Sequence, residues 1–250
     1  MPQWVEAGLW GLVGGAALVL GAAAAWWVRV PRRVVAGIMA FGAGVLISAF
    51  AFDLVDEAQQ AGGLGPTAGG FLGGAAVYVL INVLLARRGA QHRKRSGGRQ
   101  PSEQDTAGSG AAIAVGALLD GVPESVVLGL SLLGGGGIGV TVLAAVFISN
   151  VPEGLSSAAG MKAAGRSARY VFGVWTGIAV ASGVAALVGN LLLRTASPAT
   201  VAAITAVAAG AILAMIADTM IPEAFERTEL YTGLLATIGF LTAFVIGHAG

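Results

Sequence analysis

The sequence predicts an all-α protein that crosses a membrane several times. Hydrophobic residues make up 56% of its 250 residues and charged residues only 11%, whereas soluble domains typically carry about 25% charged residues. The mean hydropathy is +0.82, and the 40 glycines are typical of membrane helices that pack through small residues. This composition excludes soluble enzymes, and nothing in it indicates binding to nucleic acid. The chain has no cysteine, so disulfides, thiolate metal sites and cysteine nucleophiles are also excluded.

The chain contains eight apolar stretches of the length that a bilayer core requires, about 20 residues. They are predicted to be helices over 5–28, 34–54, 68–86, 111–133, 138–160, 170–193, 199–221 and 230–248. No Lys or Arg precedes the first stretch, so we expect it to remain as a helix rather than to be a cleaved signal peptide. Residues 1–250 are therefore expected to form a single transmembrane domain. The polar segment 89–110 is expected to be a flexible cytoplasmic loop.

Basic residues are concentrated on one side of these predicted helices. Of the 14 Lys and Arg residues, only Arg194 falls on the other side. The rest follow the odd-numbered helices: Arg29, Arg32, Arg33, Arg87, Arg88, Arg93, Lys94, Arg95, Arg99, Lys162, Arg166, Arg169 and Arg227. Because Lys and Arg accumulate in cytoplasmic loops, this pattern places both termini outside the cytoplasm. We expect an integral protein of the plasma or inner membrane, in contact with membrane lipid.

The charged groups predicted to lie inside the membrane all have one sign and are carboxylates. Asp120 and Glu124 lie in the middle of the fourth predicted helix, Glu153 lies in the middle of the fifth, and Asp53 and Asp218 lie toward the ends of the second and seventh. No Lys or Arg accompanies them within a helix. Charged groups cost about 2.5–3.5 kcal/mol at such positions, so they indicate function by default. They must be protonated, hydrated, or neutralised by a bound cation, and this favours a cation path.

The spacing of these residues makes the cation interpretation more specific. In a helix, positions i and i+4 share a face, so Asp120 with Glu124, and Ser149 with Glu153, each direct two oxygen-bearing side chains to one place. Each glutamate follows Val-Pro, and a proline frees the carbonyl one turn earlier and loosens the helix beside the carboxylate. Asn150 adds an amide oxygen next to Ser149. These residues predict a cation site between the fourth and fifth helices.

An internal repeat relates the second and seventh predicted helices. Ala43-Gly44 precedes Glu57-Ala58 at the same spacing at which Ala209-Gly210 precedes Glu223-Ala224. Helices five spans apart cross the membrane in opposite directions, so we expect an inverted repeat of three helices each, as many transporters have. Asp53, Asp56 and Glu57 would then lie at the outer mouth of a path, and Glu223, Glu226 and Glu229 at the inner mouth. Asp218 is a further possible residue of this path.

The paired Pro-Glu motifs resemble those of the ZIP family of divalent metal transporters. Its members have His-Asn-x-Pro-Glu-Gly motifs in helices four and five, and the chain is also similar over 161–167, over the Gly-Val-Trp-Thr-Gly that opens helix six, and over 218–224. The resemblance implies eight helices in a three-two-three arrangement and net metal uptake toward the cytoplasm. It implies metal binding by Glu124, Asn150 and Glu153, with Asp120 and Ser149 at substituted ligand positions.

The departures from the family pattern affect which metal is expected. Asp120 and Ser149 replace the motif histidines, and Val180 stands where many members have a glutamate that binds a second metal. Oxygen ligands suit Mn²⁺ and, less selectively, Fe²⁺, whereas zinc favours imidazole and thiolate without being restricted to them. Zinc, iron and manganese therefore all stay open as the transported ion, and no resident cofactor is expected.

Two other functions remain open from the sequence. The missing histidines and Val180 are compatible with a protein that has kept the fold but lost transport, and that serves as a metal sensor or a membrane scaffold. An intramembrane hydrolase would use Asp120 or Glu124 as an acid or base, but no nucleophile motif accompanies them, so we do not expect an enzyme. The small-residue surface at 70–74 could form a homodimer or could pack helices within one chain.

Overall fold

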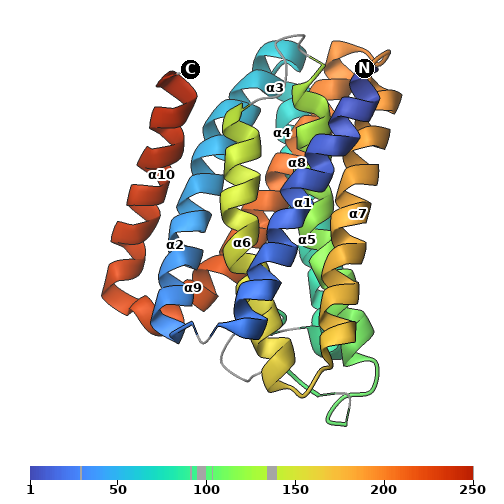
Figure 1. The fold of residues 1–250 in the computed structure, drawn as a ribbon. Helices are drawn as coiled ribbons and strands as arrows, with labels where there is room; N and C mark the ends of the chain where they lie inside the picture. The colour runs from blue at the N-terminus through green and yellow to red at the C-terminus, as the bar shows by residue number, and fades with distance from the viewer. Residues whose placement is uncertain (29, 91, 95–99, 103, 134–139, 250) are drawn as a thin grey trace.

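The computed structural model describes residues 1–28, 30–90, 92–94, 100–102, 104–133 and 140–249, without the side chains of 51–53, 140, 141 and 249. The described part is helical and contains no strand (Figure 1). Its elements are α1 (Gln3–Trp27), α2 (Arg32–Ser48), η1 (Ala49–Leu54), α3 (Val55–Gly62), α4 (Leu64–Leu85), η2 (Ala86–Ala90), α5 (Ser109–Ser131), α6 (Val140–Ala163), α7 (Ala168–Leu193), α8 (Pro198–Met215), η3 (Ile216–Met220), α9 (Ile221–Thr228), η4 (Glu229–Tyr231) and α10 (Thr232–Ala249).

The described helices include 6 candidate membrane spans that are long and apolar enough to cross a bilayer. They are Gln3–Trp27, Leu64–Ala90, Ser109–Ser131, Val142–Ala163, Ala168–Leu193 and Pro198–His248. The last is a run of 51 residues that contains both α8 and α10, and α2 is an α-helix of only 17 residues. The helical, membrane-spanning character is thus confirmed, while eight spans in a three-two-three arrangement stay a prediction.

The helices pack in a bundle of close pairs. α1 packs against α6 and α7, α5 packs against α7, α4 against α8, and α2 against α10. Figure 1 shows α10 at one edge of the bundle, where it lies alongside α2, and shows the two marked chain ends at the same end of the bundle. One apolar core lies around α2, α6 and α8, and a second lies between α1, α5, α6 and α7. The site described below lies where α4, α5 and α6 meet the connection between α4 and α5.

The two segments related by the sequence repeat have the same order of elements. α2 continues into the π-helical η1 and the eight-residue α3, and α8 continues into the π-helical η3 and the eight-residue α9. Pro222 lies in the first turn of α9 and has no N–H to donate to the preceding turn, which accounts for the irregular helix in η3. Asp53 lies in η1 and Asp218 in η3.

Two matching glycine contacts hold each of these segments to its neighbour, four contacts in all. In each contact a Cβ on the glycine would meet the backbone of the facing helix, so only glycine permits the approach. The pairs are Gly44 with Ala236 and Gly239 with Phe41 between α2 and α10, and Gly210 with Phe71 and Gly74 with Val207 between α8 and α4. Two of these glycines, Gly44 and Gly210, occupy corresponding positions of the sequence repeat.

Candidate functional site

Three carboxylates are buried between α5 and α6. The side chains of Asp120 and Glu124 on α5 and of Glu153 on α6 are 1%, 1% and 3% exposed. Pro123 and Pro152 both lie within their helices, one residue before a glutamate. The carboxylates expected in the middle of the fourth and fifth predicted helices are thus buried side chains of α5 and α6.

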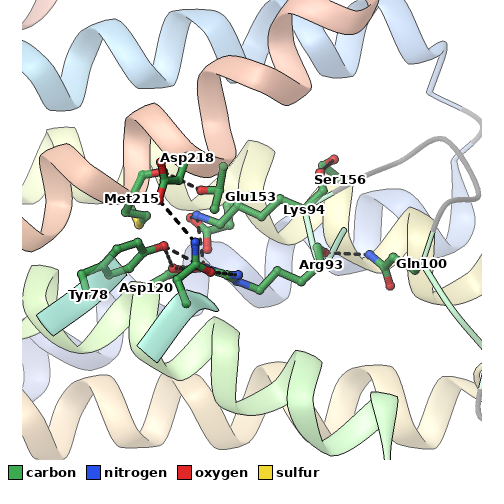
Figure 2. Close-up of polar contacts among 11 residues, drawn as sticks. Tyr78, Arg93, Lys94, Gln100, Asp120, Glu153, Ser156, Met215 and Asp218 are labelled. Atoms are coloured by element: carbon green, nitrogen blue, oxygen red, sulfur yellow. Dashed lines mark hydrogen bonds and ion pairs between the residues drawn. The ribbon is translucent and has the colours of Figure 1, made fainter. Parts of the chain in front are cut away.

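A basic residue outside the membrane helices binds Asp120. The guanidinium of Arg93 donates from Nε to Asp120 Oδ2 and from Nη2 to Asp120 Oδ1, both at 2.9 Å (Figure 2). This two-pronged geometry is the strongest that arginine makes with a carboxylate. Tyr78 Oη donates to Asp120 Oδ1 at 2.7 Å and accepts from Arg93 Nη2 at 2.8 Å, and Arg93 Nη1 donates to Asn82 Oδ1 at 2.7 Å. Asp120 and Arg93 thus form a dense, fully buried hydrogen-bond network with α4.

Lys94 binds the second carboxylate. Its ammonium lies 2.8 Å from Glu153 Oε2 and 3.4 Å from Asp120 Oδ2, and the side chain is 3% exposed. Residues 89–110 were predicted to be a flexible loop, and this is wrong for Arg93 and Lys94, whose side chains are buried in the bundle. The physical reason is that the membrane helices supply carboxylates without basic partners, and the adjacent connection supplies the missing positive charge.

Local backbone features let the connection enter the bundle. Gly89 has φ +94°, a conformation that other residues rarely adopt, and it turns the chain back after α4. Gly116 on α5 leaves the room that the Arg93 side chain occupies, because a Cβ there would lie 2.6 Å from Arg93 Cδ. The buried Gln100 donates from Nε2 to the carbonyls of Arg93 at 2.7 Å and of Ser157 at 3.1 Å. We refer to residues 92–94 as the inserted segment.

Glu124 differs from the other two carboxylates because neither of its oxygens has a hydrogen-bond partner among the described residues. It lies close enough to Glu153, Lys94 and Asp120 to interact with their charges. A buried carboxylate without a partner is costly, and the cluster holds three carboxylates against two basic groups. This excess of oxygen ligands and negative charge is suited to a cation.

The described hydrogen bonds of Asn150 and Ser149 are made outside this cluster. Asn150 Nδ2 donates to the Gly14 carbonyl of α1 at 3.0 Å, and Ser149 Oγ donates to the Val146 carbonyl of its own helix at 3.0 Å. Both side chains are buried. The hydrogen bond of Asn150 uses its amide nitrogen and leaves the amide oxygen available as a ligand.

The four residues predicted for the path lie in different places. Glu57 lines a cavity of about 390 Å³ together with Gln3 and Arg194, whereas the buried Glu223 accepts a hydrogen bond from Ser156 Oγ at 3.0 Å. Asp218 is exposed and accepts from Asn82 Nδ2 at 3.4 Å, so Asn82 links it to Arg93. The side chain of Asp53 lies outside the described residues.

As they stand, the described side chains do not form a metal site. Among them, no three histidine, aspartate or glutamate side chains lie close enough together to hold a metal ion. Asp120 and Glu153 contact Arg93 and Lys94 instead of converging on one point. Coordination of a metal by these carboxylates would require the two basic side chains to leave.

Comparisons with known proteins identify no relative of this chain. No family model matches it, and no curated protein matches it. Its function is therefore inferred from the chemistry of the buried cluster.

Proposed function

We propose that this protein is a membrane transporter of divalent metal cations, with net uptake toward the cytoplasm. The observation that carries the proposal is Glu124, a fully buried carboxylate to which no described residue donates a hydrogen bond. It lies in a cluster where, among the described side chains, carboxylates outnumber basic groups. Such a carboxylate is stable inside a membrane only when protonated or when a cation binds. Asp120, Glu124 and Glu153, with the amide oxygen of Asn150 and the hydroxyl of Ser149, would supply an oxygen-rich set of ligands.

The ligand chemistry favours hard and borderline divalent cations as substrates. Carboxylate and amide oxygens suit Mn²⁺ and Fe²⁺, and carboxylates also bind Zn²⁺. A monovalent cation would neutralise less of the buried negative charge. We therefore propose divalent ions as the substrate class, with manganese, iron and zinc as the candidates.

The internal pairing of helices supports an alternating-access mechanism. The contacts of α2 with α10 match those of α8 with α4, which supports two repeats packed in opposite orientation. Transporters with inverted repeats bind substrate at the interface of the repeats. We propose eight spans in a three-two-three arrangement, in which α5 and α6 carry the site between the repeats. The resemblance of the paired Pro-Glu motifs to ZIP transporters supports the same arrangement.

The cavity beside Glu57 supports a route to the site from that side. The cavity lined by Glu57 also includes Val127, which lies three residues after Glu124 on α5, a rise of about 4.5 Å along the helix. On the other side, Ser156 and the buried Glu223 lie next to the inserted segment. The order Glu57, Glu124, Glu153 and Glu223 is the sequence of carboxylates that a cation would meet.

The decisive experiment is uptake of Mn²⁺, Fe²⁺ and Zn²⁺ into liposomes that contain the purified protein. We expect saturable uptake by the natural protein and its loss in Glu124→Gln combined with Glu153→Gln. Glu6→Gln is the matched control, because Glu6 lies in the first turn of α1, away from the cluster. Equal uptake by the natural protein and the double variant would contradict the proposal.

A transport-inactive metal sensor or membrane scaffold is the second candidate. It is favoured by one observation, the two basic side chains that already neutralise Asp120 and Glu153. It predicts saturable metal binding by the folded protein without uptake of any of the three ions. Binding measured by isothermal titration on the same preparation therefore separates the two candidates.

A further inference from the structure

The inserted segment places two positive side chains where a transported cation would bind. Lys94 Nζ lies 2.8 Å from Glu153 and 3.4 Å from Asp120, and Arg93 occupies both oxygens of Asp120. These are two of the carboxylates that the proposed function assigns to the metal. A cation and the inserted segment therefore compete for the same oxygens.

Resting on that proposed function, we propose that the inserted segment is an internal competitor of the transported cation. It fills the site when no cation is bound, and a divalent cation opens the cytoplasmic side by displacing it. Arg93 and Lys94 thereby become determinants of selectivity, because a monovalent ion offers the carboxylates no more charge than Lys94 already does. A divalent ion carries twice that charge at a single point, so it can displace the basic side chains from the carboxylates.

The way the segment is held permits it to leave as a unit. It belongs to no helix, and Arg93 N–H donates to the carbonyl of Ala90 at 3.2 Å in a turn. Its own carbonyls are held by side chains of other parts of the chain, that of Arg93 by Gln100 and that of Lys94 by Ser156 Oγ at 2.5 Å. Its exit therefore breaks side-chain contacts and leaves the hydrogen bonds of the membrane helices intact.

The position of the segment closes one end of the proposed route. Figure 2 shows the side chains of Arg93 and Lys94 directed toward Asp120 and Glu153, with Ser156 and Gln100 on the side of the connection. The Ser156 hydroxyl also lies 3.0 Å from Glu223 Oε1. A cation that moves from Glu153 toward Glu223 must pass the place that the Lys94 backbone occupies.

The absence of cysteine makes the segment directly testable. Ser157 is buried, it shares a helix face with Glu153, and its carbonyl accepts from Gln100. In Ser157→Cys the single thiol is expected to react slowly with a polar maleimide while the segment is inserted. We expect Mn²⁺ or Zn²⁺ to speed the reaction about tenfold, and NaCl at equal ionic strength to leave the rate unchanged.

A substitution outside the carboxylates displaces the segment without touching the ligands. Gly116→Ala places a Cβ against Arg93 Cδ, so in the Ser157→Cys background we expect fast labelling even without a divalent ion. Gly189→Ala on α7 is the matched control, because its Cβ would meet the nearest atom at 3.6 Å, an ordinary contact. Arg93→Gln with Lys94→Gln gives the same test by removing the charges, and it covers the case in which Gly116→Ala fails to fold.

The outcomes separate this proposal from the proposed function. Labelling that is slow in metal-free protein and rises with a divalent ion supports internal competition, whether or not uptake is measured. Labelling that ignores divalent ions and is equally slow in the Arg93, Lys94 double variant would overturn it. If liposome uptake is nevertheless measured, the transport proposal is supported and only the proposal of internal competition fails.

Discussion

Tyr78 shows how a single hydroxyl couples a membrane helix to the inserted segment. It lies on α4, it is 1% exposed, and it donates to Asp120 while it accepts from Arg93. Both partners are charged and buried, so neither can replace the lost bond with water. The hydroxyl therefore stabilises the inserted state rather than either helix alone.

We predict that Tyr78→Phe lowers the free energy of unfolding by about 1–3 kcal/mol, the cost of a buried polar group that loses its partner. The measurement is chemical denaturation of the purified protein in detergent. Tyr231→Phe is the control and should have no effect, because the Tyr231 side chain is 69% exposed. Equal stability of the two variants would show that the Tyr78 network contributes little.

The sequence predicts the acidic half of the site but not its basic half. Asp120, Glu124 and Glu153 are detectable because charge inside an apolar helix is costly and therefore conspicuous. Arg93 and Lys94 are not, because basic residues next to a membrane helix are the general rule and most of them are solvated. The detectable signal was indirect: carboxylates without basic partners in their own helices, and Gly116 one turn before Asp120 on α5.

At the scale of elements, paired glycines fix the contacts of the repeated segments. Gly44 approaches the Ala236 backbone, and Gly210 approaches that of Phe71 at the corresponding place. In a membrane such contacts depend on close van der Waals packing, because in lipid there is no hydrophobic driving force for helices to associate. Each pair of helices is therefore sensitive to one added methyl group.

We predict that Gly44→Ala and Gly210→Ala each lower stability by about 1–3 kcal/mol, the usual cost of overpacking a tight contact. Gly73→Ala on the exposed face of α4 has nothing within 4 Å of the added Cβ. It should be neutral or slightly stabilising because alanine favours helix over glycine by up to about 1 kcal/mol. Thermal unfolding of the three variants in one detergent checks this, and a loss in only one of the first two would argue that the repeats pack differently.

Helix positions follow from hydropathy, but the irregular helices do not. The predicted stretch 111–133 corresponds to α5 (Ser109–Ser131), and 170–193 corresponds to α7 (Ala168–Leu193). The π-helical η1 and η3 lie inside predicted helices whose hydropathy gives no sign of a change in helix type. Their extra residue per turn depends on packing with other helices, and only Pro222 after η3 gives a local signal.

At the scale of the whole molecule, the connections with basic residues and the connection with Arg194 belong to opposite ends of the bundle. The bias of basic residues predicts that the connection between α4 and α5 faces the cytoplasm. Because the chain has no cysteine, a single introduced cysteine reports on the side where it lies. Gln104 and Thr195 are both exposed and lie on the two opposed connections.

We predict that Thr195→Cys reacts with an impermeant maleimide on intact cells, and that Gln104→Cys reacts only after the membrane is permeabilised. Labelling is measured by the mass shift of the purified protein. Reversed accessibility of the two positions would show the opposite orientation and would turn the proposed uptake into export.

The short connection between Arg93 and α4 also affects the apparent affinity of the site for an ion. Arg93 follows the end of η2 at Ala90 by three residues, so its charge is tethered beside Asp120 at an effective concentration of millimolar order or higher. An ion from solution must outcompete this local supply, and its apparent affinity is weaker than that of the bare carboxylates. The same tether lets the segment rebind as soon as the ion leaves. The carboxylates are therefore without a bound cation or basic side chain only briefly.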